Sequence, residues 1–210
     1  MEIENNDNSQ TSIVDEEVSE IIAEDILEEY PSLKSVAPFL ALASGVQWFS
    51  TLGEDPSRSF VKTARDYVDM LGFPEAEPGF LADWEEAAEA AQSLDINSPA
   101  WEAEEQLRAA LTNDVLSIID ENTLEMVMAH VSGVVGSAIG EAALEASTHL
   151  GIQDEGFVNA VTGAAIQACY HAALVGMAAE EDNHPFAIRF QLFEQGRLPI
   201  GVIGNSFLIY

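Results

Sequence analysis

The chain has 210 residues, with 37 acidic and seven basic side chains, so its formal charge at neutral pH is −30. Apolar residues make up 48% of it, which is typical of a globular domain and too high for a disordered chain. The acidity argues against a nucleic-acid partner, which needs a basic stripe, and a single cysteine, Cys169, excludes an intrachain disulfide or a multi-cysteine zinc site.

The charge balance also predicts the solvent of the protein. Lysine occurs only twice, at Lys34 and Lys62, and the acids are spread along the chain. Self-repulsion of this size opposes compaction in dilute buffer, and salt screens it. We therefore interpret the composition as adaptation to the high-salt cytoplasm of an extreme halophile. The alternative is an acidic protein of an ordinary cell with a basic partner.

The first half of the chain predicts an acidic helical region. Residues 1–11 predict a flexible acidic tail, and the spacing of apolar residues from Ser12 predicts an amphipathic helix that ends before Pro31. An apolar segment over 33–51 follows. Asp55-Pro56 predicts the start of a helix that Gly72 ends. Further acidic helices are expected over 78–94 and from Ser98-Pro99, so the region extends over 12–121.

Residues 122–183 differ because they carry few charges and many small side chains. This pattern predicts a tightly packed hairpin of two long helices that turns near Gln153. Gly133, Gly136 and Gly140 are expected to let the two backbones approach closely. A charge-free stretch over 157–179 is long enough to span a membrane, but polar residues interrupt it and no basic residue flanks it. Membrane insertion is therefore not expected.

Residues 184–210 show an alternation of period two, which predicts strands. The expected elements are a strand over 186–192, a strand over 199–203, a turn at Gly204-Asn205 and a last strand over 206–210. The last strand offers an open edge unless another element covers it. Arginines outnumber acids here by two to one, so this sheet lacks the acidic coat and is either packed on the helical body or engaged with a partner. The interface candidates are Phe186, Ile188, Arg189, Phe190, Arg197, Phe207, Ile209 and Tyr210.

The predicted fold is therefore mainly α. It is a multi-helix bundle with a small C-terminal antiparallel β-hairpin or three-stranded meander, and residues 12–210 form one domain.

Candidate chemistry is sparse, because no nucleotide-binding, hydrolase or metalloprotease motif occurs. In the predicted hairpin, His130, His171 and Glu141 come within a few turns of one another and are ligand-binding candidates; the alternative is that the histidines are ordinary structural residues. Arg58, Lys62 and Arg65 share one face of a predicted helix. They predict a site for an anion or acidic partner, or ion pairs with the acidic helix over 15–29. We expect no metal and no cofactor.

Two functions remain open. The first is a noncatalytic interaction or structural protein, a homo-oligomer or a partner of another protein, that assembles through the C-terminal sheet or apolar helix faces. The second is an enzyme or small-ligand binder with a pocket between the long helices.

Overall fold

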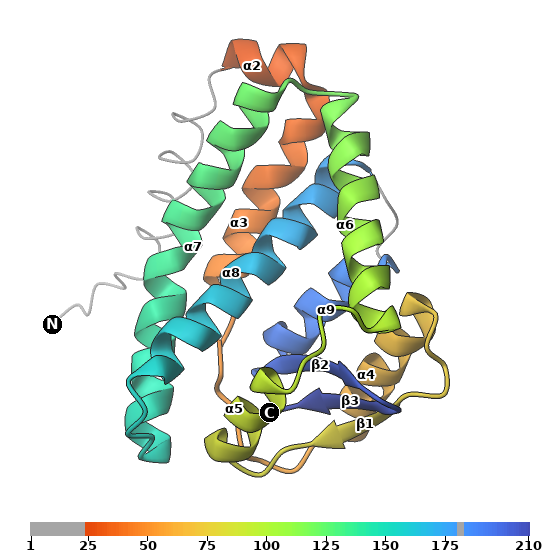
Figure 1. The fold of residues 1–210 in the computed structure, drawn as a ribbon. Coiled ribbons are helices and arrows are strands. Elements are labelled where there is room, and N and C mark those ends of the chain that lie inside the picture. The colour runs from red at the N-terminus through yellow and green to blue at the C-terminus, as the bar shows by residue number, and fades with distance from the viewer. Residues whose placement is uncertain (1–23, 180–182) are drawn as a thin grey trace, which may run out of the picture.

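A computed structural model describes residues 24–179 and 183–210 (Figure 1). Over these residues the chain is mainly α with a small three-stranded sheet, which confirms the predicted fold class. The predicted tail over 1–11 and the first part of the amphipathic helix, up to residue 23, lie outside the described residues. The elements are α2 (Glu24–Glu29), η1 (Pro31–Ser35), α3 (Val36–Ser44), α4 (Arg58–Leu71), β1 (Glu77–Phe80), α5 (Trp84–Gln92), α6 (Pro99–Leu116), α7 (Glu121–Leu150), α8 (Gly156–Met177), α9 (Pro185–Glu194), β2 (Pro199–Ile203) and β3 (Ser206–Ile209).

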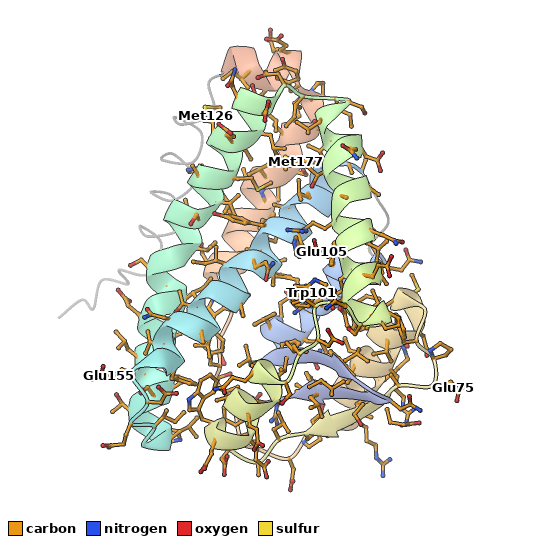
Figure 2. The ribbon with its side chains drawn as sticks, in the orientation of Figure 1. Glu75, Trp101, Glu105, Met126, Glu155 and Met177 are labelled. Carbon is orange, nitrogen blue, oxygen red and sulfur yellow. The ribbon has the colours of Figure 1, made fainter. Side chains whose placement is uncertain are left out.

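The predicted hairpin of long helices is present as α7 and α8. Helix α7 is capped at its start by Asp120, whose carboxylate accepts the Thr123 N–H, and at its end by Gly151, which adopts a left-handed conformation with φ of 68°. Glu155, labelled in Figure 2, lies in the turn that follows. Helix α8 crosses the middle of the molecule and packs against α3, α6, α7 and α9 (Figure 1).

The predicted role of the glycines in this hairpin is wrong. A Cβ atom added at Gly133 or Gly140 would have no atom within 4 Å, and one at Gly136 would only touch the Ile166 side chain at 3.8 Å. The buried face of α7 is instead a row of branched side chains at helical spacing that includes Val127, Val131 and Ile139. Helix α7 therefore packs through this valine-rich row and not through its glycines.

The predicted strand over 186–192 is also wrong, because these residues form helix α9. Pro185 is its first residue, and the His184 ring Nδ1 accepts the Phe186 N–H as an N-cap. Phe186 and Phe190 lie in the core of the helical part, while Ile188 and Leu192 lie in a second core on the sheet. A helix buried on both sides carries apolar residues at nearly every other position, and this mimics the alternation of a strand.

The C-terminal hairpin is confirmed, but its third strand comes from elsewhere. Strands β2 and β3 pair in antiparallel register across Gly204-Asn205. Strand β1 pairs with β3 in parallel, so the order is β1-β3-β2 and both edges of β3 are occupied. The helix expected over 78–94 is shorter, since Pro78-Gly79 belongs to β1 and α5 begins after its N-cap residue, Asp83.

Candidate functional site

The three hairpin candidates have separate environments. The His171 side chain is buried and its ring stacks on Phe186 with centroids 4.3 Å apart. Burial, with the positive charges of Arg189 and Arg108, lowers the pKa of His171 to about 3. The Nε2 atom of His130 is buried without a hydrogen-bond partner, and burial lowers the pKa of this histidine too. Glu141 is exposed.

The basic triplet on α4 is exposed and partly paired. Lys62 Nζ lies 2.5 Å from Asp66, and Arg65 forms a two-pronged pair with Glu77 at the start of β1. The described part of the acidic helix over 15–29, which is α2, lies at the opposite end of the molecule (Figure 1). Exposed pairs of this kind contribute little to stability.

The interface candidates of the C-terminal segment lie inside the chain's own core. All of them except Arg189 are less than a tenth exposed: Phe186, Ile188, Phe190, Arg197, Phe207, Ile209 and Tyr210. Arg189 is only partly covered, and its Nη1 atom lies 2.5 Å from Glu104 Oε2 on α6. The other oxygen of Glu104 accepts a hydrogen bond of 2.6 Å from the buried Tyr67 hydroxyl. These three residues connect α4, α6 and α9. The C-terminal segment carries few acidic residues because most of it is buried in the chain's own core.

A cavity of about 870 Å³ lies beside the sheet. Its walls are the loop after α3, the N-terminus of α5, the C-terminal part of α7 and the last residue of the chain. It is partly open to solvent and has the size typical of small-molecule sites. The lining comprises Val46, Gln47, Trp48, Phe49, Ser50, Leu52, Gly53, Glu54, Ala82, Asp83, Trp84, Ala138, Ala142, Glu145, Ala146, His149, Leu150, Ile152 and Tyr210.

One wall of this cavity is aromatic and held in place. The indole N–H of Trp84 donates to Asp154 Oδ2 at 2.6 Å, which lowers the pKa of that carboxyl. The Trp84 ring also meets Phe157 edge to face, with centroids 4.9 Å apart. Trp48 is buried, and its indole N–H has no hydrogen-bond partner. An unpaired buried donor costs on the order of 1–3 kcal/mol.

The loop over 45–57, which carries Trp48, is strained and anchored. Phe49 adopts a left-handed backbone with φ of 59°, which is rare for a bulky residue. The Thr51 N–H donates to the Gly196 carbonyl and its hydroxyl to the Gln195 carbonyl. The Arg197 guanidinium donates to the Glu54 carbonyl at 2.5 Å. The end of α9 therefore fixes the loop in its strained form.

The polar groups of the lining are mostly acidic. Glu54, Asp83 and Glu145 contribute carboxylates, and His149 lies one turn after Glu145 on α7. Burial and the neighbouring Asp83 raise the pKa of the Tyr210 hydroxyl. Over the described ranges, no group of three or more His, Cys, Asp or Glu side chains is arranged to hold a metal ion.

Sequence reasoning missed this site, and His130, His171 and Glu141 are not among its lining residues. Two signals pointed toward it. The first is the aromatic pair Trp48-Phe49, which follows the end of α3 and lies outside any helix. The second is the pair of small side chains, Ala138 and Ala142, on a helix that otherwise packs through valines. The small side chains leave the space that the cavity occupies.

Comparison of the chain with known protein families, curated proteins and solved structures gives no match. Helices α7 and α8 are long and apolar enough to cross a membrane, which is weak evidence because core helices pass the same test. In its most apolar stretch, 28% of α7 is buried, against 50% of α8. Helix α7 is thus the more exposed of the two.

Proposed function

We propose that the protein binds a small organic molecule in the cavity between α5, α7 and the loop over 45–57. The observation that carries this proposal is the cavity itself, because a hollow of about 870 Å³ with an aromatic wall and convergent polar groups is typical of a ligand site. The left-handed Phe49 supports it, since backbone strain of this kind concentrates at functional sites. An acceptor on a bound molecule that reached the Trp48 N–H would remove the cost of that unpaired donor.

The test is a ligand-observed NMR screen with a panel of small amines, alcohols and carboxylates on three proteins. Ala142 lines the cavity, so Ala142→Phe fills part of it; Ala129 lies exposed on the same helix, so Ala129→Phe is the matched control. We expect molecules that bind the wild type and the control, and lose binding to Ala142→Phe. A panel without binders, or binders that Ala142→Phe leaves unaffected, would contradict the proposal.

A second candidate function is noncatalytic assembly of copies of this chain through the outward face of α7. Met126, labelled in Figure 2, and Leu144 are exposed on this helix, and from residue 126 to residue 140 it carries no Asp, Glu, Lys or Arg. Exposed apolar faces without charge are typical of protein interfaces. Since the buried interface candidates of the C-terminal sheet are occupied within the chain, an apolar helix face is the better supported of the two predicted assembly routes.

Light scattering in multimolar KCl tests this second function. Among residues 24–179 and 183–210, none would lie within 4 Å of a Cβ atom at Gly133 outside its own helix, so Gly133→Arg fits against this part of the chain and should block a contact between chains. We expect the wild type to associate, Gly133→Arg to be monomeric, and Leu42→Glu on the exposed face of α3 to behave as wild type. A wild type that is monomeric at every concentration would contradict assembly and leave ligand binding untouched.

We also propose that the protein works in a high-salt cytoplasm. In the described part of the chain, four acidic side chains form ion pairs with a lysine or arginine, so most carboxylates there have no cationic partner. Screening of their repulsion should raise the urea midpoint of unfolding steeply from dilute buffer to multimolar KCl. A midpoint that does not rise with salt would contradict this proposal.

A further inference from the structure

We infer that the ligand of the cavity is an organic cation, an alkylated ammonium group on a small carbon frame. This inference rests on the proposed ligand-binding function and names the chemical class that the site selects. It follows from the charges of the lining, from the helix end beside it and from the aromatic wall.

The charges of the lining favour a positive ligand. Glu54, Asp83 and Glu145 are the charged side chains of the wall, which includes no lysine or arginine. Arg197 lies behind the loop, where it donates to the Glu54 backbone and reduces the negative potential without cancelling three carboxylates. An anion would be repelled on entry, whereas a cation would be attracted and concentrated by this field.

The C-terminus of helix α7 reinforces this preference. Helix α7 has 30 residues, and its last turn, with Ala146, His149 and Leu150, lies at the cavity. The C-terminus of a helix carries a partial negative charge that favours cations. The N-terminus of α5, which has the opposite sign, is already capped because the Asp83 carboxylate accepts the Glu86 N–H.

The aromatic wall distinguishes an organic cation from a metal ion. A positively charged group is attracted to the faces of indole and phenol rings, and alkylated ammonium ions use this attraction most. Trp48, Trp84 and Tyr210 all belong to the lining, and Trp84 is fixed by Asp154 and Phe157 before any ligand arrives. A volume of about 870 Å³ is far larger than a bare ion needs, and the described carboxylates form no metal cluster.

The experiment compares choline with 3,3-dimethylbutan-1-ol, a neutral molecule of the same shape. Dissociation constants for the full chain are measured by NMR titration at constant ionic strength. The cation–π term alone predicts that choline binds about 5- to 30-fold more tightly. Ala142→Phe should abolish the binding of choline, which places it in the cavity.

Charge-removal variants show whether the carboxylates cause the preference. Glu145→Gln should reduce the preference for choline a few-fold, and Asp83→Asn, which retains the helix cap, should do the same. Glu141→Gln is the matched control, because Glu141 is exposed one turn earlier on α7 and does not line the cavity.

The other outcomes separate the two levels of the proposal. Equal affinity for the two probes overturns the cation inference while ligand binding stands. A choline preference that both charge-removal variants leave at its wild-type size overturns the role of the carboxylates in that preference. Binders from the earlier panel together with no binding of choline also overturn it. A panel without any binder removes the proposed function itself.

Discussion

Two neighbouring regions of the molecule solve the same packing problem in opposite ways. In the sheet core, α4, α9 and the strands enclose apolar side chains, and the partly buried Glu104 beside them is paired with both Arg189 and Tyr67. Next to this core, α5, α7 and the loop over 45–57 leave a cavity whose carboxylates have no basic residue in the wall. The difference teaches that this acidic chain pairs an acid with a cation where helices enclose it and leaves the wall of the cavity negative.

The largest expected effect comes from breaking the ion pair between Arg189 and Glu104 beside the sheet core. Arg189→Met would leave Glu104 partly buried without its cation, and we expect a loss of about 3 kcal/mol in the free energy of unfolding. Urea unfolding measures this loss. Arg108→Met is the control, because Arg108 pairs with Glu105 on the surface and its replacement should cost less than about 1 kcal/mol. Equal effects of the two variants would mean that enclosure of the Arg189–Glu104 pair adds nothing to its contribution to stability.

A second prediction concerns Gly196, at the contact between the end of α9 and the loop over 45–57 that lines the cavity. A Cβ atom at Gly196 would lie 2.6 Å from Ser50 Oγ and 2.9 Å from the Thr51 nitrogen, and φ is +78°. We expect Gly196→Ala to cost about 2–3 kcal/mol, because left-handed strain and a backbone clash add. It should also loosen the loop and weaken any binder found for the cavity.

Gly204→Ala is the matched control for that variant. Gly204 has a similar φ of +59° in the hairpin turn, but a Cβ there meets nothing within 4 Å. Its cost should be backbone strain alone, about 1–2 kcal/mol, with unchanged ligand binding. If Gly196→Ala unfolds no more easily than Gly204→Ala, the loop is not held by α9.

The sequence predicted the helical class, the long hairpin and the C-terminal β-hairpin, because caps, apolar periodicity and Gly204-Asn205 are local signals. Helix α9 was misread since its alternating apolar residues serve two cores at once, a tertiary fact that periodicity alone does not carry. Pro185, a good first helical residue, was the available warning. Strand β1 was missed because four residues with a proline and a glycine gain their partner only from β3, more than 120 positions later.

The candidate site was beyond the sequence for a related reason. Its lining comes from four separate parts of the chain, and no spacing connects Trp48, Trp84, Glu145 and Tyr210. His130 and His171 stood out because histidine is chemically versatile, yet burial determines their environment. A cavity forms where small side chains leave space between elements that the fold brings together. The sequence does not show that Ala138 and Ala142 line the same space as the loop over 45–57.

The smallest effect concerns the protonation of His171 on α8. The folded-state pKa of His171 is lowered to about 3, first by burial and then by Arg189, Arg108 and His184, whereas the unfolded chain keeps a value near 6.5. The unfolded state therefore takes up this proton first as the pH falls. The contribution of His171 is complete above about pH 6.5 and is lost as the pH falls toward 3, at up to about 1.4 kcal/mol per pH unit.

The variant His171→Phe keeps a ring for the stack on Phe186 and cannot titrate. Urea unfolding at pH 7.5 and pH 5.5 should then show a smaller loss of stability on acidification than the wild type shows, by on the order of 1 kcal/mol, since carboxylates elsewhere titrate equally in both proteins. Because a proton on His171 would add a positive charge beside Arg189, a reduced slope would locate part of the acid sensitivity at the contact between α8 and α9. An unchanged slope would mean that His171 takes up its proton as readily in the folded protein as in the unfolded chain, which would contradict the prediction.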